Sequence, residues 1–93
     1  MKKYQVAVLG ATGAVGQEMM TALAERRFPL ARLLPLASAR SAGGTVTFQG
    51  VPIRVEEATE DAFQGMDFVL GAADAGTARR FAPAIRKSGA VLI

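Results

Sequence analysis

Three evenly spaced glycines after an apolar run constrain this chain most. The run Tyr4–Leu9 is followed at once by Gly10, Gly13 and Gly16, and then by a helical pattern. Glycine at Gly10 allows a sharp turn, glycine at Gly13 leaves space for a pyrophosphate, and glycine at Gly16 allows a helix to pack closely on the strand. The free N–H groups of the first helical turn favour an anion. The segment therefore predicts a strand–turn–helix unit that binds nucleotide phosphate, with a tight turn without a ligand as the alternative.

Composition limits the chain to one domain. Its 93 residues, of which 51% are hydrophobic, suffice for a modest core but not for a cofactor domain and a substrate domain together. The chain contains no cysteine and no histidine. This excludes a cysteine nucleophile, a histidine base and the usual zinc sites within these residues, so we assign no catalytic residue and no metal ligand here.

Charge and hydropathy exclude two classes of partner. The net charge of +3 is spread over separate basic pairs, and there is no Trp, so we expect no nucleic-acid binding. No apolar run is long enough to span a bilayer, and the first residues lead into a strand rather than a signal peptide. We therefore expect a cytoplasmic protein that has no membrane contact.

The rest of the chain predicts alternating helices and strands. A helix is predicted over residues 14–27, with a core-facing stripe of Val15, Met19, Ala22 and Leu23. The other predicted elements are a strand at 33–37, a hairpin of 45–48 and 51–55 around Gly50, a short helical turn capped by Thr59 that runs through Phe63, a strand at 66–70, a helix bent or restarted at Pro83 and ended by Gly89, and a strand beginning at 90–93. This order predicts an α/β fold, a Rossmann-like doubly wound, mostly parallel sheet with helices on both faces. Because a domain seldom ends inside such a strand, we expect the chain to be the front part of a longer protein.

A second cofactor signal follows the strand at 33–37. NAD-binding domains have a carboxylate at the end of the second strand, whereas this chain has Arg40 between Ser38 and Ser41 and no acid. A guanidinium pairs with a 2′-phosphate through two hydrogen bonds, and both serines can donate to its oxygens. The segment favours NADP, with a flexible polar loop as the alternative.

A loop of small residues follows the strand at 66–70. Ala73 and Gly76 allow close approach of a ligand, and Asp74 or Thr77 can cap the next helix. At a sheet's switch point this loop flanks the pyrophosphate or the nicotinamide ribose, although a plain helix start explains it equally well.

Taken together, these segments resemble the amino-terminal part of the aspartate-semialdehyde dehydrogenases. The likeness rests on Val6–Glu18, Phe28–Leu30, Ala37–Gly43 and Phe81–Pro83, and it runs along almost the whole chain. The resemblance implies that residues 1–93 form an incomplete NADP-binding domain, followed beyond Ile93 by an α+β domain for catalysis and dimerisation. It implies a homodimer that uses NADPH to reduce β-aspartyl phosphate, an acyl phosphate, in the biosynthesis of lysine, methionine and threonine.

The resemblance also assigns cofactor contacts residue by residue. Carried over by motif, they are pyrophosphate contacts at Gly10, Thr12, Gly13, Ala14, Val15 and Gly16, and 2′-phosphate contacts at Arg40 and Ser41 with Ser38 nearby. The loop Ala72–Gly76 departs from the family pattern, and Asp74 would have to point away from the phosphates. The family's cysteine nucleophile and histidine acid/base would lie beyond Ile93.

Two other functions stay open. One is a related enzyme, an N-acetyl-glutamyl-phosphate reductase or an extended short-chain reductase, against which the Ser38–Gly43 stretch argues. The other is a free-standing module that senses NADP, which we expect to end after a capped helix rather than inside residues 90–93.

Overall fold

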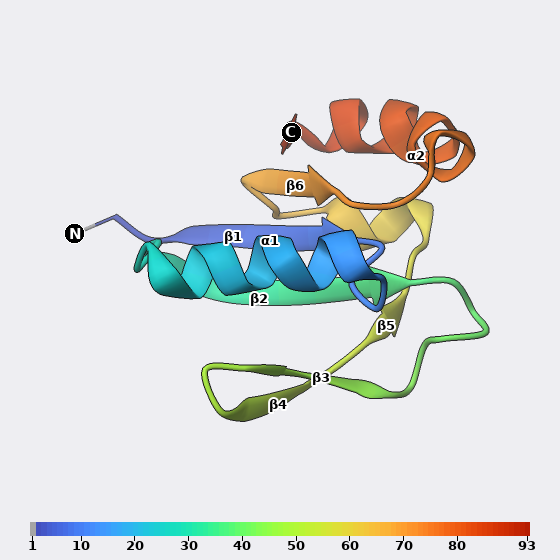
Figure 1. Cartoon of the computed structure of the whole chain (residues 1–93). Helices are drawn as coiled ribbons and strands as arrows, with labels where there is room; N and C mark the ends of the chain where they lie inside the picture. Colours follow the sequence, from blue (N-terminus) through green and yellow to red (C-terminus); the bar gives the residue numbers. More distant parts are fainter. Residues whose placement is uncertain (1) are drawn as a thin grey trace.

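The computed structural model describes residues 2–93, which form a parallel sheet with helices on both faces (Figure 1). The strands of this sheet are β1 (Tyr4–Leu9), β2 (Leu30–Ala37), β5 (Glu56–Glu57), β6 (Phe68–Gly71) and β7 (Val91–Leu92). They lie in the order β5-β2-β1-β6-β7, and all four neighbouring pairs are parallel. The chain runs outward from β1 to β5 and returns to β6, so the strand order reverses between β1 and β6. The predicted Rossmann-like α/β fold is confirmed.

Alternating side chains of β1 build two cores, one on each face of the sheet. Beneath α1 (Ala14–Glu25), the first core consists of Val6, Val8, Ala11, Met20 and Leu33. On the other face, beneath η1 (Glu60–Phe63) and α2 (Ala75–Ser88), the second core consists of Ala7, Leu9, Leu34, Leu36, Phe63, Met66, Val69, Phe81 and Ile85. Because strand side chains alternate, residues 6 and 8 serve one core and residues 7 and 9 the other.

A separate hairpin, β3 (Thr45–Phe48) and β4 (Val51–Arg54), packs against the first core. Gln49 and Gly50 connect its strands with φ values of 51° and 80°. Positive φ at both central residues matches the right-handed twist of a two-residue hairpin. The predicted hairpin and its turn glycine are confirmed, with β4 one residue shorter than expected.

The first helix differs from its prediction in extent and orientation. It ends at Glu25 rather than at residue 27, because Arg27 turns to a φ of 51° and the Phe28 N–H donates to the Leu23 carbonyl at 3.0 Å. Val15 is 51% exposed, so its predicted place in the core is wrong. Gly16 and Met20 are buried instead, because the close approach at Gly16 turns that face of the helix toward the sheet.

The second strand begins three residues earlier than predicted and holds Pro35 in its interior. The Leu36 carbonyl accepts hydrogen bonds from Gly10 and Ala11, directly after β1, and the Ala37 carbonyl accepts one from Ala58 beyond β5. By alternation the Pro35 nitrogen faces the β5 side, where pairing begins only at Leu36. The missing N–H therefore costs no ladder hydrogen bond.

Three smaller predictions need correction. Thr59 precedes η1 but its side chain makes no capping hydrogen bond. The strand predicted at 66–70 is β6 at residues 68–71, because the Met66 N–H donates to the Phe63 carbonyl in a turn. The second helix continues through Pro83 and is not restarted there. Its predicted end is confirmed, since Gly89 adopts a left-handed φ of 87°.

Among the described residues, none of the helices has the length and apolar character needed to cross a membrane.

Candidate functional site

The carboxyl ends of β1, β2 and β6 are tied together by backbone hydrogen bonds. The Gly10 and Ala11 N–H groups both donate to the Leu36 carbonyl, at 2.9 and 3.0 Å, and the Ala72 N–H donates to the Leu9 carbonyl at 2.9 Å. The loops that leave these strands therefore converge at the point where the strand order reverses. In open α/β sheets, this is where ligands bind.

A cleft of about 380 Å³ lies at this convergence. It is lined by Leu9, Gly10, Thr12, Gly13, Ala37, Ser38, Ala39, Glu57, Ala58, Ala72, Ala73, Asp74, Thr77, Arg80 and Phe81. Of the residues predicted from the sequence, the cleft brings together Gly10, Thr12, Gly13, Ser38 and Ala73. The other predicted residues lie around it rather than in its lining. These are Ala14, Val15 and Gly16 in the first turn of α1, Arg40 and Ser41 in the turn after β2, and Gly76 in the first turn of α2.

Two of the three glycines are required by the backbone alone. Gly10 has a φ of 90°, and a Cβ there would lie 2.8 Å from the Ala73 nitrogen. A Cβ on Gly16 would overlap the Gly10 carbonyl and lie 2.9 Å from the Ala11 Cα. The roles predicted for them, a sharp turn and close helix packing, are confirmed.

Gly13 is different. Its φ is −81°, and a Cβ there would meet only the Gly10 oxygen, at an ordinary contact distance of 3.6 Å. Neither conformation nor packing within residues 2–93 requires glycine at this position. Gly13 lines the cleft, so the space in front of it is available to a ligand.

The first turn of α1 offers free hydrogen-bond donors at the end of the cleft. Gly13 precedes the helix without a side-chain cap, and no acidic residue stands in the first turn. The N–H groups of Ala14, Val15 and Gly16 lack the helical partners that later residues have. These donors and the helix dipole together favour a bound anion.

The start of α2 has its own carboxylate. Asp74 Oδ1 accepts from the Thr77 N–H at 2.9 Å, and Oδ2 accepts from the Thr77 hydroxyl at 3.3 Å. These bonds, the backbone one first, lower the pKa of Asp74 below its ordinary value of 3.8. The carboxylate is therefore ionised at neutral pH and engaged with its own helix. An anion in the cleft is favoured at the start of α1 and disfavoured at the start of α2.

Arg40 stands in a tight turn that leaves β2. The Ser38 carbonyl accepts from the N–H groups of Ser41 and Ala42, at 3.0 and 2.9 Å, so residues 38–42 curl beside the cleft. Arg40 is exposed and makes no ion pair within residues 2–93. Its guanidinium can therefore pair with a ligand anion at the carboxyl end of β2.

The lining residues that sequence reasoning did not assign to the site include Glu57, Ala58, Thr77, Arg80 and Phe81. Glu57 and Ala58 follow from β5, an edge strand too short and too acidic to be recognised from its sequence. The other three had a usable signal. With Asp74 as the cap of α2, Thr77, Arg80 and Phe81 recur at a spacing of three and four on one helix face.

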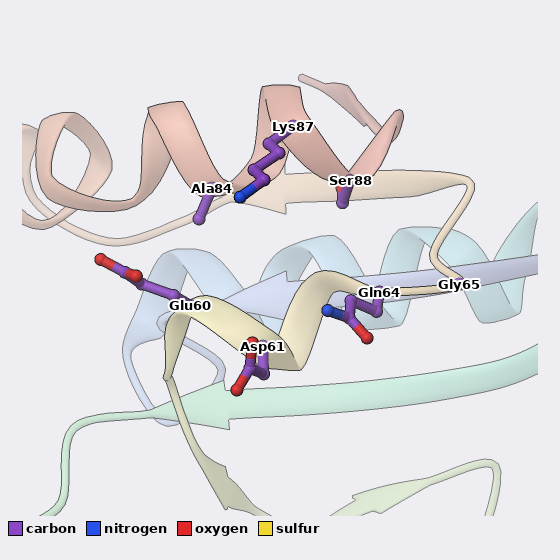
Figure 2. Close-up of a pocket in the computed structure, with 7 residues that line it drawn as sticks. All are labelled: Glu60, Asp61, Gln64, Gly65, Ala84, Lys87 and Ser88. Carbon is purple, nitrogen blue, oxygen red and sulfur yellow. The ribbon is translucent and has the colours of Figure 1, made fainter.

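A second hollow, of about 430 Å³, lies between η1 and α2 (Figure 2). Figure 2 shows Lys87 reaching from α2 toward η1, while Asp61 points away from α2. Glu60 and Asp61 are exposed, and no ion pair joins them to Lys87 among the residues described. The hollow is lined by the carboxylates of Glu60 and Asp61 in the first turn of η1, which disfavour an anion there, and it lacks the three-glycine turn of β1–α1. The cleft at Gly10–Gly13 is therefore the candidate site.

Comparison with known proteins identifies the family. The family model described as "Semialdehyde dehydrogenase, NAD binding domain" matches residues 5–93. The chain belongs to this family. The resemblance recognised from the motifs of the sequence is thereby confirmed, and residues 5–93 match the family's NAD-binding domain.

Relatives and solved structures agree with this assignment. The chain is 51% identical over 89 residues to the aspartate-semialdehyde dehydrogenase of Synechocystis, covering 96% of this chain and 26% of that protein. It matches the structure of aspartate semialdehyde dehydrogenase II from Vibrio cholerae, complexed with ASA, with a TM-score of 0.91 and 37% identity, covering 98% of this chain and 30% of that one. It also matches the Candida albicans enzyme with NADP, with a TM-score of 0.77 and 25% identity over 98% of this chain and 29% of that one. The chain thus spans between a quarter and a third of the length of these proteins.

Proposed function

We propose that this chain is the NADP-binding part of an aspartate-semialdehyde dehydrogenase, a cytoplasmic homodimer that reduces β-aspartyl phosphate with NADPH in the biosynthesis of lysine, methionine and threonine. The observation that carries the preference for NADP is Arg40, which makes no ion pair within residues 2–93 and lies two residues after Ser38 beyond the end of β2, where NAD-binding domains have a carboxylate. The names of the relatives support the reaction, and the NADP in the Candida albicans structure supports the cofactor.

The cleft supports a definite placement of the cofactor. Gly10, Thr12 and Gly13, with the free amides of Ala14, Val15 and Gly16, would hold the pyrophosphate, and Ser38, Arg40 and Ser41 would hold the 2′-phosphate. Ala73 and Gly76 flank it from the β6–α2 side. NADPH supplies the hydride. The chain itself has neither cysteine nor histidine, so the nucleophile and the acid/base of the reaction come from the α+β domain proposed beyond Ile93.

One observation favours NADH as a second candidate. Glu57 lines the cleft, and its Cα pairs in register with that of Ala37 at the end of β2. A carboxylate close to the ribose accepts a hydrogen bond from a 2′-hydroxyl and repels a 2′-phosphate. The Glu57→Gln variant separates the two cofactors. If Glu57 binds the ribose of NADH, Glu57→Gln weakens NADH binding. If Arg40 determines the cofactor instead, Glu57→Gln leaves the binding of both NADPH and NADH unchanged.

The reaction is tested with the purified full-length protein that carries this chain. We expect NADPH oxidation, followed by absorbance, with β-aspartyl phosphate and much less with N-acetyl-glutamyl phosphate. Turnover of only the second substrate would favour the related reductase. Binding of NADPH without turnover of either substrate would favour the sensing module.

A further inference from the structure

The second turn of α2 forms one wall of the cleft. Thr77, Arg80 and Phe81 line it, whereas the neighbouring Arg79 does not. Successive helical residues point about 100° apart, so two adjacent arginines face different surroundings although both are exposed. The Arg80 side chain therefore lies at the cleft, whereas the Arg79 side chain lies outside it on the exposed surface.

Phe81 holds Arg80 in place. The Phe81 ring is 3% exposed and packs against the Phe63 ring, with 5.7 Å between centroids, so the second core fixes its position. The Arg80 Cζ lies 4.8 Å from the centroid of the Phe81 ring, within the range of a cation–π contact. This contact occupies at most one face of the planar guanidinium. Arg80 is exposed and makes no ion pair among the described residues, so its guanidinium can meet a ligand in the cleft.

Three alanines line the same cleft as Arg80, and we call them the alanine floor. Ala37 ends β2, and Ala58 and Ala73 follow the ends of β5 and β6, so none of the three fills the cleft with a large side chain. The free amides that attract phosphate lie elsewhere, at the start of α1. A flat group with little charge fits this floor, and guanidinium planes stack well on such groups.

We propose that Arg80, backed by Phe81, stacks on the purine base of the bound dinucleotide and positions it over the alanine floor. This inference rests on the proposed function, because it assumes that a purine dinucleotide occupies the cleft. It adds a cofactor contact on α2 to those of the glycine turn and the Arg40 turn. Arg80 acts on the base and Arg40 on the 2′-phosphate.

Three variants of the full-length protein test this role: Arg80→Ala, Arg80→Lys and, as a matched control, Arg79→Ala. The probes are adenosine 2′,5′-bisphosphate, which carries the base, and nicotinamide mononucleotide, which carries a phosphate but no purine. Stacking on a base is typically worth enough that Arg80→Ala should weaken binding of the bisphosphate about tenfold or more. Arg80→Lys keeps the charge and loses the plane, so it should weaken binding nearly as much. Arg79→Ala should bind both probes as the wild type does, and the mononucleotide should not distinguish the four proteins.

Each other outcome overturns a specific statement. Full rescue by Arg80→Lys, or an equal loss for the mononucleotide, shows an electrostatic contact and overturns stacking. An equal loss in Arg79→Ala shows a general effect of surface charge and also overturns it. If Arg80→Ala binds the bisphosphate as tightly as the wild type does, the stacking inference is wrong but the proposed function stands. If the wild-type protein binds neither NADPH nor the bisphosphate, the proposed function is wrong. Thermal unfolding of every variant ensures that folded proteins are compared.

Discussion

At the scale of single residues, the three glycines of the turn divide by what they contact. Gly10 and Gly16 face backbone atoms at distances that exclude a side chain. Gly13 faces open space in the cleft. Glycine is therefore required by the fold at residues 10 and 16, whereas at residue 13 it leaves space for a ligand.

A pair of substitutions separates these roles. Gly13→Val should lower the free energy of unfolding by only about 1 kcal/mol, because valine is a poorer N-cap than glycine, while φ at residue 13 is already negative and a Cβ makes only an ordinary contact. It should weaken NADPH binding by at least about tenfold, since the side chain occupies the space of the pyrophosphate. Gly16→Ala should destabilise the protein by about 1–3 kcal/mol, as overpacking does. Denaturant unfolding and calorimetric binding measure both effects, and a Gly13→Val protein that unfolds would show that Gly13 is a packing residue.

The sequence predicted the site only where local spacing encodes it. The strand and the three glycines stand within residues 4–16, the helix pattern continues from there, and the Ser38–Ser41 turn follows a strand directly. Glu57 and Arg80 reach the cleft only through the pairing of β5 with β2 and the docking of α2 on the sheet. Glu57 had no local signal, whereas the spacing of Asp74, Thr77 and Arg80 marks one helix face but does not show that this face meets the cleft.

At the scale of elements, the two helix starts beside the cleft differ in charge. The start of α1 is uncapped, whereas Asp74 caps α2 through its bonds to Thr77. With Gly13 before α1 and Asp74 before α2, only the start of α1 favours a phosphate.

The cap makes a prediction about pH. Because the pKa of Asp74 is lowered on folding, its carboxylate stabilises the folded protein above the ordinary value of 3.8, and this contribution is lost as pH falls through the folded pKa. Asp74→Ala should therefore melt below the wild type at neutral pH, and the gap in Tm should shrink in acid. Asp74→Asn, which keeps a capping oxygen, should lose less at neutral pH. A gap that stays constant from pH 7 to pH 2 would contradict an ionised cap.

Errors in the predicted elements have physical causes of the same kind. Periodicity placed α1 correctly but rotated its buried face, because the glycine at residue 16 lets that side of the helix approach the sheet. Residues 56 and 57 form a strand only because β2 offers them two partners at its edge. Hairpin and helix-end signals at Gly50 and Gly89 succeeded because a left-handed φ is a local requirement.

At the scale of the whole molecule, the sheet has an open side at β7. In the described chain β7 pairs only with β6, and Val91, Leu92 and Ile93 are exposed apolar residues. An unpaired apolar strand edge is a template for association.

The isolated 93-residue chain should therefore self-associate as its concentration rises. Val91→Lys should reduce this, because a charge on an edge strand opposes pairing with another edge. Val51→Lys is the matched control, because Val51 lies in the hairpin and is 59% exposed, close to the 54% exposure of Val91. Sedimentation velocity measures the association. Equal relief by both substitutions would assign it to general charge rather than to the β7 edge.

The central claim is that the cleft binds a dinucleotide and that Arg40 selects the one with a 2′-phosphate. Calorimetric titration of the full-length protein and its Arg40→Ala variant with NADPH and NADH tests it most directly. The substitution should cost about 1.5–3 kcal/mol of NADPH binding, the range for hydrogen bonds to charged groups, and leave NADH binding nearly unchanged. Equal losses for the two cofactors, or a wild-type protein that prefers NADH, would contradict the account.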